Sequence, residues 1–189
     1  MQSNLLWTGR EYYSLENCVV DVGKEGSITN STIVGLYEGS LYQVGYTIKT
    51  NSDWQTTSVE LNTQVYDKRK VYRFESDGNG KWTSDGKACP EFDKCVDVDI
   101  PLTPFTNTLP LKRLKLSVGQ SQDITVLYFD ILARKFSLVR QKYQRLSERQ
   151  YKYENIPNDF EAVITVDQDC FVVDYPGLFS RAVRKESKY

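Results

Sequence analysis

The chain has 189 residues, with 24 Lys and Arg residues against 25 Asp and Glu residues and no histidine. This balance excludes a global electrostatic attraction to nucleic acid or to an anionic membrane, so a partner of either kind would need a local patch. The lack of histidine excludes Ser-His-Asp and Cys-His catalysis and His-ligated metal sites, and without a glycine-rich nucleotide loop we expect no cofactor.

The composition favours an all-β fold. Tyr, Phe and Trp number 13, 8 and 3, and these side chains, with Val and Thr, suit a pleated and half-buried surface. The length suits one domain. We therefore predict a single β domain over residues 1–180, followed by a charged and frayed tail over residues 181–189.

The first residues show no basic segment followed by an apolar core, and no later run has the length needed to span a bilayer. We expect a cytoplasmic protein without an integral membrane segment. The cysteines are then reduced thiols, and their spacing completes no zinc site, so we expect no bound metal. The cysteines are Cys18, Cys89, Cys95 and Cys170.

Alternating polar and apolar residues begin the predicted sheet. Ser27–Val34 and Tyr42–Ile48 alternate and are separated by a glycine-containing turn, and Trp54 opens a third strand that runs to Leu61. These segments predict successive antiparallel strands.

Turn signals follow these strands. Val65–Glu75 predicts a hairpin around Asp67–Lys70, and Asp77–Gly80 predicts a tight turn that leads into Trp82. The second turn begins like an EF-hand calcium loop, but Gly86 stands where a bidentate Glu is required. We therefore interpret it as a plain hairpin turn.

The run Cys95–Leu116 is the most informative stretch. Asp97 and Asp99 fall on one face of an alternating segment, and Arg113 lies in a second alternating segment after a proline-rich loop. We predict that the two segments are paired strands joined by an ordered connection. A charged patch on the sheet would result.

The last third of the chain predicts more strands. Ile124–Phe129 is apolar on both faces, which indicates a covered strand, and Phe160–Val166 and Phe171–Asp174 alternate. Ala133–Tyr153 fits either a helix or a hairpin, and we choose the hairpin because its neighbours are strands. This region is also basic and rich in tyrosine, which suits either a single-stranded nucleic acid or a solvated outer face. We expect the outer face, and no nucleic-acid partner.

Two strings of residues carry a family resemblance. Thr103–Pro110, preceded by Val96–Asp99, and Asp174–Phe179 far downstream resemble the Putative glycolipid-binding family. The similarity runs from about Trp7 to Phe179. It implies a fold similar to bacterial lipoprotein carriers and a glycolipid ligand, and it implies glycine at the turn position that Cys170 holds.

This resemblance completes the predicted fold. We expect a long antiparallel meander curved into a half-barrel or partly open barrel. A weak internal similarity between the Asp77 and Asp167 turns predicts two similar intertwined halves, residues 1–100 and 101–180.

The leading functional hypothesis is a noncatalytic binding protein whose concave face holds an amphipathic ligand, a glycolipid or a lipid. Aromatic rings would contact sugar rings or acyl chains, and charged groups would bind hydroxyls or a phosphate. The candidate ligand-binding residues are Trp54, Trp82, Asp97, Asp99, Arg113, Tyr143 and Tyr175.

Two alternatives remain open. Asp97 and Asp99 lie about 6.6 Å apart along a strand, a separation comparable to that of the two carboxylates of glycosidases. In that case the protein is a carbohydrate-active enzyme. The other alternative is a scaffold whose exposed edge or aromatic patch binds another protein.

Overall fold

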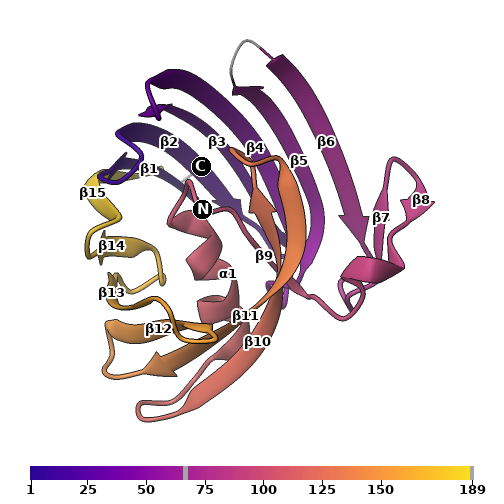
Figure 1. Cartoon of the computed structure of the whole chain (residues 1–189). Helices are drawn as coiled ribbons and strands as arrows, with labels where there is room; N and C mark the ends of the chain where they lie inside the picture. Colours follow the sequence, from indigo (N-terminus) through magenta and orange to yellow (C-terminus); the bar gives the residue numbers. More distant parts are fainter. Residues whose placement is uncertain (66–67, 188–189) are drawn as a thin grey trace.

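The structure is a computed structural model that describes residues 1–65 and 68–187. Over this part of the chain one mixed sheet of 15 strands curves around a single α-helix (Figure 1). The sheet runs from β8 through β1 and β15 to β9, so the chain ends lie in the middle of the sheet and not at its edges. The all-β prediction and the predicted open, barrel-like curvature are confirmed.

The first half of the chain forms a continuous antiparallel meander in which each strand pairs with the next. Its strands are β1 (Gln2–Gly9), β2 (Ser14–Val22), β3 (Gly26–Tyr37), β4 (Ser40–Asn51), β5 (Thr56–Val65), β6 (Lys68–Ser76), β7 (Trp82–Ser84) and β8 (Lys87–Ala88). The hairpin expected around Asp67–Lys70 is formed by β5 and β6, although its residues 66 and 67 lie outside the described residues.

The second half forms a similar series after a short 3-10 helix, η1 (Pro90–Phe92). It contains β9 (Asp97–Asp99), the helix α1 (Phe105–Leu114), β10 (Ser121–Asp130), β11 (Lys135–Arg145), β12 (Gln150–Ile156), β13 (Glu161–Val166), β14 (Val172–Tyr175) and β15 (Phe179–Ser187). All neighbours are antiparallel except β9, which pairs in parallel with β10. The predicted hairpin over Ala133–Tyr153 is confirmed as β11 and β12.

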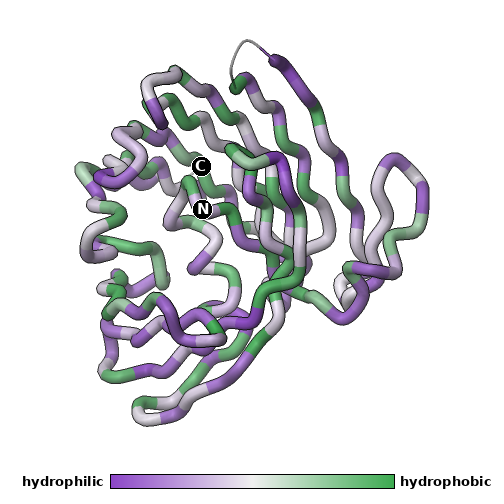
Figure 2. The backbone as a smooth tube through the Cα atoms, viewed as in Figure 1, coloured by the Kyte–Doolittle hydropathy of each residue, from purple (hydrophilic) through white to green (hydrophobic). Residues whose placement is uncertain are grey.

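Alternation of side chains gives the sheet an apolar inner face. In β1, for example, Leu5 and Trp7 are fully buried while Asn4 and Thr8 are exposed, and Cys18 of β2 lies opposite Leu5 on the inner face. Figure 2 shows the same alternation of hydrophobic and hydrophilic residues along neighbouring strands. Because strand side chains point alternately to the two faces, this pattern fixes which face holds the core.

The last residues do not form the expected frayed tail. Residues 181–187 belong to β15, which pairs with β1 over the whole length of that strand. Arg184 donates hydrogen bonds to Asp167 and Asp169, at 2.5 Å each, which ties the strand to the β13–β14 turn. Residues 188 and 189 lie outside the described residues. The tail prediction was wrong because pairing with β1 orders a segment whose own sequence is mostly charged.

The second predicted strand of the central stretch is also corrected. Residues 105–114 form α1, which lies against the concave face of the sheet (Figure 1). Phe105 and Leu109 pack into the core of the first half, while Leu111 packs into the core of the second half. Thr103 Oγ1 accepts a hydrogen bond from Phe105 N at 3.0 Å, which satisfies one free N–H at the start of the helix. Burial on both sides therefore selects the helix over the strand that alternation suggested.

The edges of the sheet overlap instead of pairing. Phe129 and Phe136, on the face of the β10–β11 hairpin that points away from α1, contact Phe74 of β6 at ring-centroid distances of 5.1 and 5.5 Å. Tyr72 of β6 contacts Phe136 at 4.9 Å. We call these four rings the aromatic overlap. It joins the two ends of the sheet through side chains, so the barrel stays open.

Candidate ligand-binding site

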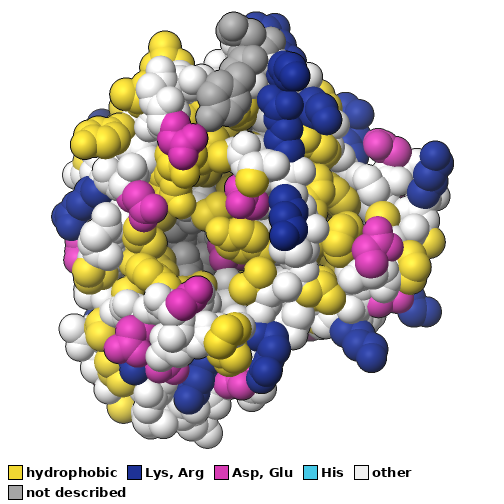
Figure 3. All heavy atoms as spheres, viewed as in Figure 1, with side chains coloured by type: hydrophobic (Ala, Val, Ile, Leu, Met, Phe, Trp, Pro, Cys, Tyr) yellow, Lys and Arg dark blue, Asp and Glu magenta, His cyan; other side chains and the backbone are white. Residues whose placement is uncertain are grey.

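A cavity of about 360 Å³ opens beside α1 on the concave side of the sheet. Figure 3 shows this face of the molecule hollowed, with hydrophobic side chains in the hollow and acidic side chains around it. The lining residues are Glu11, Tyr12, Asp99, Pro101, Thr103, Asn107, Tyr128, Val139, Tyr153, Asn155, Phe160, Tyr175, Leu178 and Phe179. Its size and mixed lining are typical of small-molecule sites.

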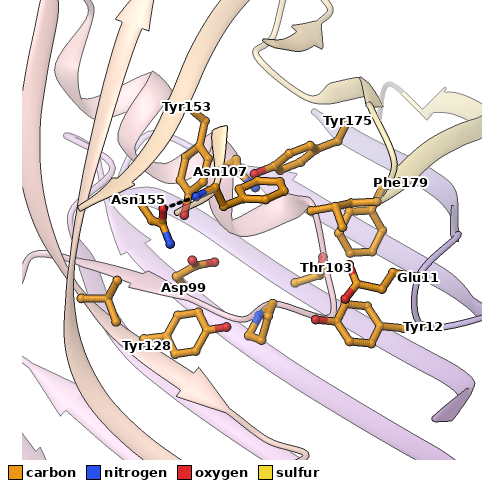
Figure 4. Close-up of a pocket in the computed structure, with 14 residues that line it drawn as sticks. Glu11, Tyr12, Asp99, Thr103, Asn107, Tyr128, Tyr153, Asn155, Tyr175 and Phe179 are labelled. Carbon is orange, nitrogen blue, oxygen red and sulfur yellow. Dashed lines mark hydrogen bonds between the residues drawn. The ribbon is translucent and has the colours of Figure 1, made fainter. Parts of the chain in front are cut away.

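Many separate parts of the chain supply these side chains (Figure 4). Glu11 and Tyr12 come from the β1–β2 turn, Asp99 ends β9, and Asn107 lies in α1. The other strands that contribute are β10, β11, β12, β14 and β15. Side chains two residues apart on a strand point to the same face, so Tyr153 and Asn155 of β12 both face the cavity.

One side of the cavity is an aromatic wall formed by Tyr153, Phe160 and Tyr175. Each ring contacts the other two, at centroid distances of 6.1 Å for Tyr153 with Phe160, 6.1 Å for Tyr153 with Tyr175 and 6.2 Å for Phe160 with Tyr175. Phe179 extends the wall, 6.3 Å from Tyr175. Such packing holds the rings in place, and rigid rings offer flat apolar surface to a ligand at little entropic cost.

Asp99 lies on another side of the cavity. Its Oδ1 accepts a hydrogen bond from Thr106 Oγ1 at 2.8 Å, and its Oδ2 accepts one from Gln141 Nε2 at 2.6 Å. Burial raises the pKa of Asp99 above its usual value, and these hydrogen bonds offset part of that rise. Both donors are neutral. Among the described residues, no cationic side chain bonds this carboxylate.

A second set of hydrogen bonds supports the cavity floor. Tyr143 Oη donates to Asn107 Oδ1 at 3.0 Å and lies 3.4 Å from Gln141 Oε1. Tyr143 is only 2% exposed, so it positions groups that reach the cavity and does not line it.

A buried carboxyl group lies behind the cavity wall. Glu16 Oε1 accepts hydrogen bonds from Ser31 Oγ at 2.7 Å, Tyr46 Oη at 2.7 Å and Thr103 Oγ1 at 2.9 Å. Its Oε2 is buried and has no hydrogen-bond partner among the described residues. Burial raises the pKa of Glu16 to about 7, and the three hydrogen bonds act in the opposite direction. Because Thr103 also lines the cavity, this network links the core to the site.

The electrostatic environment of the cavity is negative. Asp99 and Glu11 line it together with four tyrosines, and no Lys or Arg is present among its lining residues in the described chain. Burial raises the pKa of Tyr12, Tyr128 and Tyr153, and neighbouring acidic groups raise these values further. The phenols therefore stay neutral and can donate or accept hydrogen bonds.

The structure separates the predicted site residues. Asp99 and Tyr175 line the cavity, and Tyr143 lies directly behind it. Asp97 is 1% exposed and bound by Arg113, whose Nε donates at 3.1 Å, so this pair stands outside the lining.

The two predicted tryptophans also lie elsewhere. Trp82 is buried, and its Nε1 donates to the Cys95 carbonyl oxygen at 2.8 Å. Trp54 lies in the turn between β4 and β5, with Lys112 Nζ 5.3 Å from the ring centroid. Neither residue is in the cavity lining.

Sequence reasoning missed most of the lining residues. Tyr12, Tyr128, Tyr153, Asn107 and Asn155 were not among the candidates, although all reach the cavity. A signal was present for β12, where Tyr151, Tyr153 and Asn155 alternate with charged residues and so share one face. No such signal pointed to Asn107 of α1, because the sequence predicted a loop there.

Arg140 and Lys142 of β11 and Lys152 of β12 form ion pairs. Lys142 pairs with Glu154 at 3.7 Å, and Lys152 pairs with Glu154 at 2.9 Å and Glu161 at 3.0 Å. Within the described residues, no group of three or more His, Cys, Asp or Glu side chains is close enough to hold a metal ion. In the same part of the chain, no helix has the length and apolar character needed to cross a bilayer.

The fold and the cavity together define a β-barrel-like protein with an open sheet and a small-molecule cavity on its concave side. Residues 4–181 match the family described as Putative glycolipid-binding. The chain belongs to this family, as the two residue strings predicted.

Solved structures support the fold. A DUF1089 family protein from Pseudomonas aeruginosa is 34% identical, with a TM-score of 0.79 over 88% of this chain and 91% of that chain. A β-barrel-like protein of the domain of unknown function DUF1849 from Brucella abortus is 10% identical, with a TM-score of 0.54 over 97% of this chain and 95% of that one. At such identity the second likeness shows the fold alone. No match was found among curated proteins.

Proposed function

We propose that this protein is a noncatalytic binding protein for a glycolipid, whose sugar end enters the cavity beside α1. The observation that carries the proposal is the aromatic wall of Tyr153, Phe160 and Tyr175 beside the hydrogen-bonding groups of Asp99 and Asn155. Family membership supports the same ligand class.

The lining suits a sugar ring. One face of a sugar ring is apolar and packs on aromatic side chains, while its hydroxyls need donors and acceptors at the edges. The cavity volume of about 360 Å³ lies near the lower end of small-molecule sites, so it fits a headgroup and leaves the lipid chains outside.

The site does not favour a phosphate headgroup. Arg113, the cation that we predicted could bind a phosphate, is held by Asp97 and is not in the lining. The two carboxylates that line the cavity would repel an anion.

The glycosidase alternative is weaker. Such an enzyme needs two carboxyl groups that flank the scissile bond, and only Asp99 of the predicted pair lines the cavity, where the second carboxylate is Glu11 from the β1–β2 turn. Asp97 is buried and bound by Arg113. We therefore propose binding without hydrolysis, which is tested by incubating the protein with glycolipid and analysing the products.

Native mass spectrometry of the full chain tests the proposal. Glycolipids are offered beside lipids with the same chains and no sugar, and we expect only the glycolipids to be retained. Val139→Trp should fill the cavity and reduce retention at least about tenfold, which corresponds to about 1.4 kcal/mol.

The matched control is Leu138→Trp. Leu138 directly precedes Val139 on β11, is 42% exposed and is not in the lining. It should retain ligand like the wild type. Failure of the wild type to retain any glycolipid, or equal retention by both variants, would overturn the proposal. Assembly with another protein and no retained lipid would instead support the scaffold alternative.

A further inference from the structure

We propose that the cavity selects a headgroup with a free amine, the protonated amino group of an amino sugar, over a neutral or anionic sugar of the same size. The inference rests on the proposed function and names the ligand class for the same site.

The first observation is a carboxylate that lacks a counter-ion. Asp97 and Asp99 are two residues apart on β9, where Asp97 is buried and Asp99 is half-buried. Arg113 neutralises Asp97 through three hydrogen bonds. Among the described residues Asp99 is bonded by neutral groups, the side chains of Thr106 and Gln141 and the backbone of Ile100.

A buried charge without a partner is costly, and a carboxylate can accept about four hydrogen bonds. Asp99 accepts one side-chain bond on each oxygen and one backbone bond from Ile100, so it keeps acceptor capacity. It also lines the cavity, in contrast to Asp97. A ligand ammonium group would supply the missing positive charge and the additional donors.

The second observation is the composition of the rest of the lining. Glu11 adds a second carboxylate at the mouth, and no Lys or Arg lies among the lining residues in the described chain. Burial is the main cause of the raised pKa of Tyr153 and of Tyr175. Asp99 raises both values further, so its field reaches across the cavity. The interior therefore attracts a cation and repels an anion.

The third observation is the position of the aromatic wall. Figure 4 shows Tyr153 and Tyr175 on one side of the cavity, and Asp99 and Tyr128 on the other. Aromatic ring faces attract ammonium groups, because the ring carries negative charge on its faces. An amino sugar between these groups can pack its ring on the wall and direct its amine to Asp99.

These observations also separate the candidate headgroups. A neutral sugar could pack on the wall but would leave Asp99 without a counter-ion. A phosphate-bearing headgroup would bring negative charge beside Asp99 and Glu11. An amine without a neighbouring phosphate satisfies both the wall and the carboxylate.

The test is calorimetric titration of the full chain with three methyl glycosides, those of glucosamine, N-acetylglucosamine and glucose. The three probes share one ring, and acetylation removes the charge of the amine. We expect the glucosamine derivative to bind at least about tenfold more tightly than the other two, since a charge-assisted hydrogen bond forms. Equal affinities, or no binding of any probe, would overturn the inference.

A substitution of Asp99 tests whether this residue causes the preference for the amine. Asp99→Asn removes the charge and should make the three probes bind alike. The matched control is Asp123→Asn, on the outer side of the neighbouring strand β10, where Asp123 is 48% exposed and pairs with Arg140. It should keep the preference.

If Asp99→Asn does not fold, the comparison of the three probes on the wild type still decides. A preference retained by folded Asp99→Asn would also overturn the inference. The proposed function fails separately, through the glycolipid retention experiment, because that experiment includes neutral glycolipids.

Discussion

Arg113, in the last turn of α1, binds Asp97, the first residue of β9, through both carboxylate oxygens. Arg113 Nε lies 3.1 Å from Oδ1 and 3.2 Å from Oδ2, and its Nη2 lies 2.5 Å from Oδ2. Asp97 is 1% exposed, and burial raises its pKa while Arg113 acts to lower it. The pair fixes the end of the helix against the strand whose other end holds Asp99 in the cavity.

Arg113→Met should leave Asp97 buried without a partner. We expect a loss of about 3–5 kcal/mol in the free energy of unfolding, because a buried carboxylate keeps its desolvation cost when its cation is removed. The control is Arg140→Met, whose surface pair with Asp123 has side chains 60% and 48% exposed and should change stability by less than about 1 kcal/mol. Urea denaturation measures both values, and equal losses would contradict the prediction.

Glu16→Gln should change how stability depends on pH. The pKa of Glu16 is raised from 4.5 to about 7 in the folded protein, so its protonation favours the folded state. That stabilisation is fully present below pH 4.5 and is lost as pH rises through about 7.

The wild type should therefore lose about 3 kcal/mol relative to Glu16→Gln between pH 4.5 and pH 8. Denaturation at a series of pH values measures this difference. The control, Glu148→Gln, removes an exposed carboxylate and should run parallel to the wild type. A constant difference between wild type and Glu16→Gln would show that Glu16 does not titrate in this range.

Trp82→Phe should reduce stability without affecting ligand retention. Phe cannot replace the hydrogen bond from Nε1 to the Cys95 carbonyl, and a buried carbonyl left without a donor costs about 1–3 kcal/mol. Denaturation and native mass spectrometry test the two parts. Loss of glycolipid from a variant that keeps its stability would return Trp82 to the ligand-binding residues.

Deletion of residues 181–189 should abolish cooperative folding, although the sequence there is mostly charged. The deletion removes most of β15, which pairs with β1 and joins the two halves of the sheet, and it removes Arg184 from Asp167. A chain that ends at Ser187 keeps β15 and serves as the control. Circular dichroism during heating compares the two, and a native-like transition in the shorter chain would contradict the prediction.

Alternation made most strands predictable. In Tyr42–Ile48 the polar and apolar residues separate onto two faces, so local sequence and burial agree, whereas in Ser27–Val34 the alternation predicts the strand but Ser27 and Ser31 are buried and Ile28 is exposed. β15 was missed for the opposite reason. Its sequence is mostly charged, its Arg181 and Arg184 are held by Asp167, and its order comes from β1, which lies far away in the sequence.

The helix and the cavity depend on contacts that local sequence does not record. α1 is buried on both sides, so it lacks the single apolar stripe that marks an amphipathic helix, and Pro110 within it argues against a helix. The alternation of side chains along β12 and β14 indicates that Tyr153 and Tyr175 face inward. It does not show where on the inner face these two residues lie near Asp99. That proximity results from the curvature of the whole sheet.

In a closed barrel the number of strands and their stagger set the radius, because every strand is hydrogen-bonded on both sides. Here the ends are joined by the aromatic overlap of Tyr72, Phe74, Phe129 and Phe136 and by single hydrogen bonds such as that from Arg134 Nη2 to the Val65 carbonyl, and no strand ladder closes the sheet over the described residues. The spacing between the two ends therefore depends on the size and packing of side chains and not on the stagger of a closed ladder. A change in the size of one of these four rings would therefore alter the curvature of the sheet, and with it the room beside α1, without altering the pairing of the strands.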